Sequence, residues 1–287
     1  MRINKNIASI NIYREYSKNL IKQGSSLERI SSGIKINNSK EDPNAMAQSE
    51  RFRMQIRGLQ MAGNNAQDGV SMLQTAEGSL DGITSMLQRV RELVVQAGGT
   101  TTDSDKADIQ KEITQMLSGV DDMANNNEFN GVKLLNVGAA AGPIGVATGA
   151  IPMVTGVISG EKIDIPTYNL TAIGLKLRDG TTDLVDVTNT DTALSLGLVD
   201  DALDAIMGAR SKFGALENRF QSSSDSIIAM SDKIQSTESS IRDTDLATEM
   251  MEYSKYNLLV EAGNAMMVQS NQLPQNALKI LENVRSR

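Results

Sequence analysis

Residues 52–94 read FRMQIRGLQMAGNNAQDGVSMLQTAEGSLDGITSMLQRVRELV and carry an apolar side chain at every seventh position. A second row of apolar residues accompanies the first, so the apolar repeat averages 3.5 residues. Such a repeat keeps one stripe of a helix facing a partner helix, which is the requirement of a coiled coil. The same pattern returns in residues 199–241. Two seams this far apart in sequence predict that the chain turns round and packs on itself as a long antiparallel coiled-coil helical bundle.

Each repeat therefore has two rows. In the first repeat they are Phe52, Leu59, Ala66, Leu73, Leu80, Leu87 and Val94, accompanied by Ala62, Ala76, Ile83, Val90 and Ala97. In the second repeat they are Val199, Ile206, Phe213, Phe220, Ile227, Ile234 and Ile241, accompanied by Ala202, Ala209, Leu216 and Met230. We expect these residues to face the partner helix.

The two ends of the chain predict amphipathic helices over residues 4–33 and 244–284, because their apolar residues recur at threes and fours. Residues 1–30 contain six basic and two acidic residues, and residues 243–287 contain four basic and six acidic residues. This opposite charge favours pairing of the N- and C-terminal helices with each other. Each helix has a narrow apolar stripe, so we expect both to be weakly ordered until neighbouring copies cover it. Pro274 lies inside the second helix and predicts a kink or a break there.

Local signals set the remaining boundaries. Asp42-Pro43 predicts a helix start, because an Asp N-cap accepts from an orphan N–H and Pro suits the first helical position. That helix is expected to end at Gly98-Gly99, and a shorter one is expected from Thr102 or Asp103 to about Asn125. Residues from 129 to about 190 are rich in Gly, Thr and Pro and are the only part that predicts strands and turns.

The predicted fold class is therefore mainly α, with a small β-hairpin region. The predicted domains are an inner coiled-coil domain of residues 1–43 plus 243–287, and a helical core domain of residues 44–242 that contains the β region at about 129–190. Only 3% of the 287 residues are aromatic and Trp is absent, so a single large globular core is not expected.

The composition excludes most enzyme chemistry. The chain has no Cys and no His, which removes thiolate nucleophiles, the usual general base near neutral pH and the commonest zinc ligand. We therefore expect neither an enzyme nor a cofactor. A net charge of −7 argues against nucleic acid as a partner. The N-terminus lacks the apolar core of a Sec-type signal peptide, and the uncharged stretch 134–160 is too rich in Gly and Pro for membrane insertion.

Three acidic pairs stand out in the sequence, and none of them predicts a metal site. Asp103 and Asp105 have the spacing of a calcium loop, but no ligands follow at the later positions, so a helix N-cap is the better interpretation. The pairs Asp121-Asp122 and Asp200-Asp201 lie beside apolar stripes and are interpreted as hydrated helix faces.

Five motifs resemble those of the bacterial flagellins. They are Ser31–Asn37 (SSGIKIN), Gln88–Gln96 (QRVRELVVQ) and Phe129–Leu135 (FNGVKLL) of the N-terminal region, with Asp243–Glu249 (DTDLATE) and Gln272–Asn276 (QLPQN) of the C-terminal region. The resemblance covers roughly residues 1–135 and 192–280. It implies a structural subunit that self-assembles into the extracellular flagellar filament, with the large outer domains of some flagellins absent. It further implies unfolded export through the flagellar type III apparatus, a flagellin chaperone, and hook-associated and cap proteins as partners.

Three sets of residues follow as candidates. The self-assembly set consists of Ile3, Ile7, Ile10, Leu20, Leu27, Ile30, Leu259, Met266, Leu273 and Ile280. Arg89, Leu93, Gln96 and Glu112 match the flagellin surface that the flagellin-sensing Toll-like receptor of the host binds; the alternative is a face that serves assembly alone. Flagellins are often O-glycosylated in their middle region, where this chain has Thr155, Ser159, Thr167, Thr171, Thr181, Thr182 and Thr188; ordinary turn chemistry explains these equally well.

Two other classes of protein stay open. Pro43 stands where many flagellins have Ala, and hook–filament junction proteins of the same superfamily often have Asp-Asp-Pro there. A secreted coiled-coil signalling protein is the third class. A filament repeats the same contact between subunits along its whole length, whereas a signalling ligand makes its receptor contact once. Repetition of the contact therefore distinguishes the classes.

Overall fold

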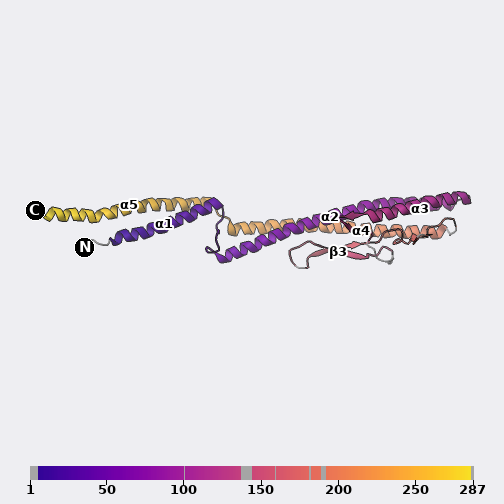
Figure 1. Cartoon of the computed structure of the whole chain (residues 1–287), viewed down its shortest axis with the longest axis horizontal. Helices are drawn as coiled ribbons and strands as arrows, with labels where there is room; N and C mark the ends of the chain where they lie inside the picture. Colours follow the sequence, from indigo (N-terminus) through magenta and orange to yellow (C-terminus); the bar gives the residue numbers. More distant parts are fainter. Residues whose placement is uncertain are drawn as a thin grey trace. The chain divides into compact units, whose positions relative to one another are not determined.

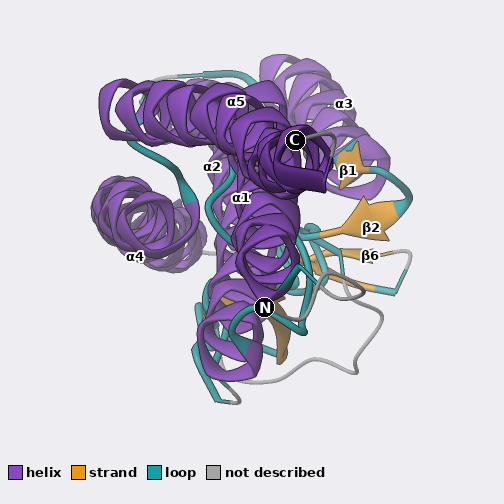
Figure 2. Ribbon diagram, turned by 90° about the vertical axis from the view of Figure 1, so that its left-hand side faces the viewer, coloured by secondary structure: helices purple, strands orange, loops and turns teal. Residues whose placement is uncertain are grey.

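The computed structural model describes residues 6–99, 101–136, 144–158, 160–180, 182–188 and 192–285, with side chains through residue 276. The helices in these ranges are α1 (Ile7–Ser32), α2 (Pro43–Ala97), α3 (Asp103–Asn126), α4 (Thr192–Arg242) and α5 (Leu246–Arg285). The strands are β1 (Glu128–Phe129), β2 (Val132–Lys133), β3 (Gly149–Val154), β4 (Lys162–Thr167), β5 (Arg178–Asp179) and β6 (Thr182–Asp183). The strands pair antiparallel as three two-stranded sheets, β1 with β2, β3 with β4 and β5 with β6. The mainly α fold with a small β region is confirmed (Figures 1 and 2).

The helix ends follow local hydrogen bonding. Asp42 Oδ1 accepts from the backbone N–H groups of Asn44 and Ala45, both at 3.0 Å, so Asp42 caps α2 directly ahead of Pro43. Thr102 caps α3 in a capping box with Asp105, whose side chain accepts from the Thr102 backbone. The interpretation of this acidic segment as a cap is confirmed, with Asp105 closing the box.

The chain forms two compact units, one of residues 1–54 and 233–287 and one of residues 55–232. Within the second unit both apolar repeats are buried, from Leu59 to Val94 on α2 and from Val199 to Ile227 on α4. Gly69 fills the gap in the second row between Ala62 and Ala76. A Cβ at this glycine would lie 2.9 Å from the Phe220 ring, so only Gly lets that ring pack against α2. In this unit, two members of the second repeat depart from the pattern, because Leu216 is half-buried and Met230 is exposed.

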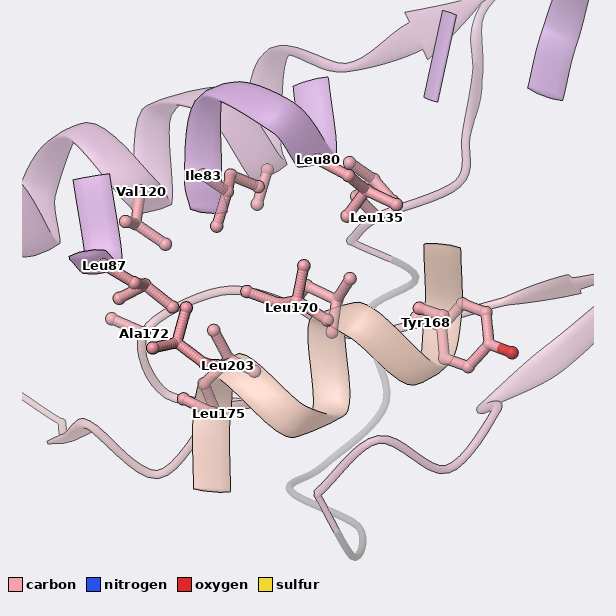
Figure 3. Packing of buried hydrophobic residues seen from close by; sticks show 14 of the residues in the cluster. Leu80, Ile83, Leu87, Val120, Leu135, Tyr168, Leu170, Ala172, Leu175 and Leu203 are labelled. Carbon is pink, nitrogen blue, oxygen red and sulfur yellow. The ribbon is translucent and has the colours of Figure 1, made fainter. Parts of the chain in front are cut away.

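The segment between α3 and α4 completes this core. Tyr168, Leu170, Ala172 and Leu175 are fully buried, and in Figure 3 they lie among side chains of α2, α3 and α4 such as Leu87, Val120 and Leu203. The Tyr168 and Phe213 rings meet edge to face, with centroids 5.5 Å apart. With few aromatic residues, this unit builds its core mainly from aliphatic side chains, which join one contiguous cluster.

Polar side chains of α3 form hydrogen bonds with the backbone of the segment between α3 and α4. Gln110 donates to the carbonyl of Val185 and accepts from the N–H of Val187. Asp121 accepts from the Ala172 N–H at 2.7 Å and from Arg178 at 3.0 Å. Arg178 also donates to Asp183 at 2.7 Å. The interpretation of both members of Asp121-Asp122 as a hydrated face was therefore wrong for Asp121, which is half-buried, and right for Asp122, which is exposed.

Asp121→Ala is expected to lower the free energy of unfolding by about 2–4 kcal/mol, because it leaves the Arg178 guanidinium and the Ala172 N–H without their partner in a mostly buried place. The adjacent exposed carboxylate provides a matched control, and Asp122→Ala should change the stability by less than about 0.5 kcal/mol. Urea unfolding followed by circular dichroism measures both. Equal effects of the two substitutions would show that Asp121 does not fasten the segment.

Candidate assembly surface

Helices α1 and α5 pack against each other in antiparallel fashion, which confirms the predicted pairing of the two ends of the chain (Figure 1). Gln23 donates to Asn257 at 2.9 Å, and Asn6, just before α1, donates to Ser270 at 2.9 Å. A Cβ on Gly263 would lie 3.3 Å from the Tyr16 ring, so the two helices also approach closely between these points.

The covered residues on both helices recur at alternating steps of three and four, which is the period of a coiled-coil seam. On α1 the covered row is Ser9, Ile12, Tyr16, Asn19, Gln23, Ser26 and Ile30. On α5 it is Glu249, Tyr253, Tyr256, Val260, Gly263, Met267, Ser270 and Pro274. Most of these side chains are polar, small or amphipathic, so the seam buries little aliphatic surface.

The strongly apolar residues of the two helices point elsewhere. Seven members of the self-assembly set are exposed in the chain: Ile7, Ile10, Leu20, Leu27, Leu259, Met266 and Leu273. Ile7 and Leu273 leave about two thirds of their surface open, at 67% and 65%. Ile30 is half-buried in the seam. Ile3 and the side chain of Ile280 lie outside the described residues.

Further exposed apolar residues, which lie outside the self-assembly set, widen this surface. They are Tyr13 and Ile21 on α1 with Leu246, Met250, Met251, Leu258 and Val268 on α5. Four of them lie off the predicted stripes, because their positions do not follow the spacing of three and four residues: Ile21, Met251, Leu258 and Val268. A helix whose apolar residues spread beyond the covered row indicates that more than one partner packs against it.

Charged groups accompany the seam. Arg29 lies between two carboxylates, 3.9 Å from Glu41 and 4.0 Å from Glu249. The lysines Lys22 and Lys255 both stand over the Tyr256 ring at 5.4 Å from its centroid. Pairs at such long range orient the helices more than they stabilise them.

The connection from α1 to α2 and the connection from α4 to α5 are joined by backbone hydrogen bonds and by a polar network. Lys35 N–H donates to the Arg242 carbonyl at 2.7 Å, and Thr244 N–H donates to the Gly33 carbonyl at 3.1 Å. The Arg242 guanidinium donates to Glu50 at 3.0 Å and to the buried Ser49 hydroxyl at 3.1 Å. The hydrogen bond from Arg242 is the main cause that lowers the pKa of Glu50 below its ordinary value of 4.5.

The receptor candidates do not share one accessible face. Arg89 and Gln96 are exposed, and the Glu112 side chain is partly exposed, at 41%. Arg89 donates to Glu112 at 2.9 and 3.1 Å from two guanidinium nitrogens. Leu93 is a core residue with 1% of its surface exposed. Its side chain packs in the core beneath this part of α2 and is not accessible to a partner.

Three of the glycosylation candidates have buried side chains: Thr155, Thr167 and Thr171. Asn169 Oδ1 accepts from the Thr171 hydroxyl at 2.8 Å, which closes a turn. Thr182 and Thr188 are exposed. Ser159 and Thr181 lie outside the described residues.

Across the described ranges, carboxylates do not gather in groups of three or more that could hold a metal ion. Within the same part of the chain, none of the helices is both long enough and apolar enough to cross a membrane.

Glu50→Gln is expected to weaken the first unit at neutral pH and to make its stability less sensitive to acid. The lowered pKa means that Glu50 stabilises the fold above its unfolded pKa of about 4.5 and that this contribution disappears as the pH falls through the folded pKa. The melting temperature should therefore fall less between pH 7 and pH 3 for Glu50→Gln than for the unchanged chain. The exposed Glu261→Gln is the control, and an identical acid response of all three chains would contradict the assignment.

Two family models match the chain. Residues 3–139 match the bacterial flagellin N-terminal helical region, and residues 196–281 match the bacterial flagellin C-terminal helical region. A flagellin of Bacillus subtilis (strain 168) is 39% identical over 306 residues, covering 98% of this chain and 100% of the relative. A flagellin of Halalkalibacterium halodurans is 37% identical, and flagellin FlaB2 of Treponema pallidum (strain Nichols) is 34% identical, with the same coverage.

Solved structures give weaker similarities. The crystal structure of Bacillus cereus flagellin shares 24% identity over 57% of this chain and 88% of its own, with a TM-score of 0.47. A structure from Vibrio parahaemolyticus, assigned to the flagellar hook-associated proteins, has a TM-score of 0.56 at 15% identity and covers 71% of this chain and 100% of its own. The latter similarity concerns the fold alone. The full-length relatives do not favour the junction protein, and Pro43 is accounted for by its place directly after the Asp42 cap.

Proposed function

The chain belongs to the bacterial flagellin family and is a structural subunit of the extracellular flagellar filament, and we propose that it enters the filament through the exposed apolar residues of α1 and α5. One observation carries this proposal: the seam between the two helices covers a mixed row of polar, small and aromatic side chains with few aliphatic ones, and leaves most of the large aliphatic residues of both helices exposed. Exposed apolar surface of this extent indicates a partner that covers it. Covering it is favourable by about 25 cal/mol for each Å² of apolar surface removed from water.

The occupant of this surface is another copy of the chain. Copies that polymerise present the same two helices repeatedly, so each open row on one subunit meets an open row on the next. The predominantly basic α1 region and the acidic α5 region add charge complementarity at the margins. The contribution of any one surface ion pair is small, so burial of the apolar rows supplies the free energy.

Ile7→Asp and Leu273→Asp are each expected to abolish polymerisation while the unit of residues 55–232 stays folded, because each places an unpaired charge in a surface that must lose water. The neighbouring exposed positions give matched controls, Asn11→Asp on α1 and Gln272→Asp on α5, and both should still assemble. Seeded growth is followed by negative-stain electron microscopy and sedimentation, and folding by circular dichroism. Long filaments from Ile7→Asp or Leu273→Asp would refute the proposed surface.

The remaining partners rest on the family. We propose export of the unfolded chain through the flagellar type III apparatus with a flagellin chaperone, and contact with hook-associated and cap proteins at the filament ends. Of the glycosylation candidates, Thr182 and Thr188 are retained as acceptors because their side chains are exposed.

A second proposed role is recognition of the soluble subunit by the host Toll-like receptor for flagellin. Arg89, Gln96 and Glu112 are its proposed contacts, and the solvent-accessible Arg89–Glu112 pair supports this. Leu93 would act only by holding α2 in place.

Arg89→Ala is expected to reduce receptor signalling by the soluble subunit about tenfold, which is the effect of losing one charge-assisted contact of about 1.4 kcal/mol. Arg91→Ala is the matched control, because Arg91 is equally exposed and pairs with Asp200 instead. A reporter-cell assay with both variants measures the difference. If the two variants signal equally, Arg89 is no receptor contact.

A further inference from the structure

Helix α5 continues through Pro274 without a break, contrary to one of the two predicted outcomes for this proline. Proline has no N–H, so the carbonyl four residues earlier, that of Ser270, loses its donor within the helix, and the proline ring crowds that carbonyl. Ser270 is buried, with 6% of its surface exposed. An unsatisfied buried carbonyl destabilises a fold, so the Ser270 carbonyl needs a donor from elsewhere.

That donor is Asn6. Its Nδ2 donates to the Ser270 carbonyl at 2.9 Å and to the Ser270 hydroxyl at 3.3 Å. The Oδ1 atom of the same side chain accepts from the Ser9 N–H at 3.2 Å, which makes Asn6 the N-cap of α1. One amide group thus satisfies a free N–H at the start of α1 and the orphaned carbonyl in α5.

The side chain at residue 6 must be short, with an acceptor and a donor on one planar group. Aspartate keeps the cap but has no N–H for Ser270. Alanine provides neither. Asparagine is therefore the residue type that fits both helices at once.

From this geometry we propose that Asn6 and Pro274 form a latch that sets the register of α1 on α5 and makes the two helices depend on each other. Pro274 weakens α5 by itself, and only a paired α1 with Asn6 opposite Ser270 restores the lost hydrogen bond. A shift of one heptad would place Asn6 against carbonyls that already have donors and would leave that of Ser270 without one. The latch rests on the proposed function in one respect, because the paired helices are the form that carries the assembly surface.

The test is a double-mutant cycle on the full-length chain. Asn6→Asp keeps the cap of α1 and removes the donor, and Pro274→Ala returns an N–H to Ser270 within α5. Asn11→Asp, at an exposed position of α1, controls for the added charge. The critical concentration for seeded polymerisation is measured for all four chains of the cycle and for the control.

Asn6→Asp should raise the critical concentration about tenfold or more with Pro274 present and less than about twofold in the Pro274→Ala background, while Asn11→Asp leaves it nearly unchanged. Equal effects of Asn6→Asp in both backgrounds, or no effect in either, would overturn the latch.

Hydrogen exchange separates the latch from polymerisation itself. In the soluble chain, Asn6→Asp should speed exchange in residues 7–12 and 266–276, and Pro274→Ala should restore protection of the second segment. If the unchanged chain forms no filaments, the proposed function fails and this measurement alone decides the latch. Exchange that is identical in the unchanged chain and in Asn6→Asp, without filaments from either, would overturn it as well.

Discussion

The pairing of α1 with α5 through a row of mixed polar, small and aromatic side chains is the constraint on which the function of this chain depends. A coiled-coil seam that mixes Ser, Asn, Gln and Gly with tyrosines and only a few aliphatic residues buries little aliphatic surface, so it fixes register and direction more than it stabilises. The covered row includes few aliphatic residues, and most of the large aliphatic side chains of both helices are exposed. Under the proposed function, a second copy of the same chain is the simplest source of a surface that covers these exposed residues.

The unit of residues 55–232 has the same spacing of apolar residues, but there the apolar rows are buried rather than exposed. There the apolar rows of α2 and α4 face each other, and Gly69 admits the Phe220 ring where a larger residue would not fit. Leu170, Ala172 and Leu175 join this core, and α3 holds their segment by its backbone through Gln110 and Asp121. This unit satisfies its apolar surface internally, so it can fold before any neighbour is present.

The sequence was sufficient to predict what depends on period and on local hydrogen bonds: the two buried ladders, the caps at Asp42 and Thr102, and the pairing of the ends. It was insufficient where the outcome depends on which of several faces a helix presents. Leu93 lies on the same side of α2 as Arg89 in a helical projection, yet it is a core residue while Arg89 is exposed. Asp121 and Asp122 look alike as a pair, but only Asp121 meets the Ala172 N–H. Likewise, a Thr-rich stretch does not reveal that Thr167 and Thr171 point inward, because that depends on a segment closing over the core.

Proline inside α5 shows how a local defect can become a specific contact. Taken alone, Pro274 predicts a weaker helix, and its cost is on the order of 3 kcal/mol relative to alanine in a helix interior. The defect is confined to one carbonyl, however, and that carbonyl faces the start of α1, where a cap is needed in any case. A hydrogen bond that exists in only one register discriminates between registers more sharply than apolar contact, which tolerates a shift of one heptad with little change. A seam whose apolar burial is small can thus still be specific, and specificity of register is what a subunit needs when its error would be repeated along a filament.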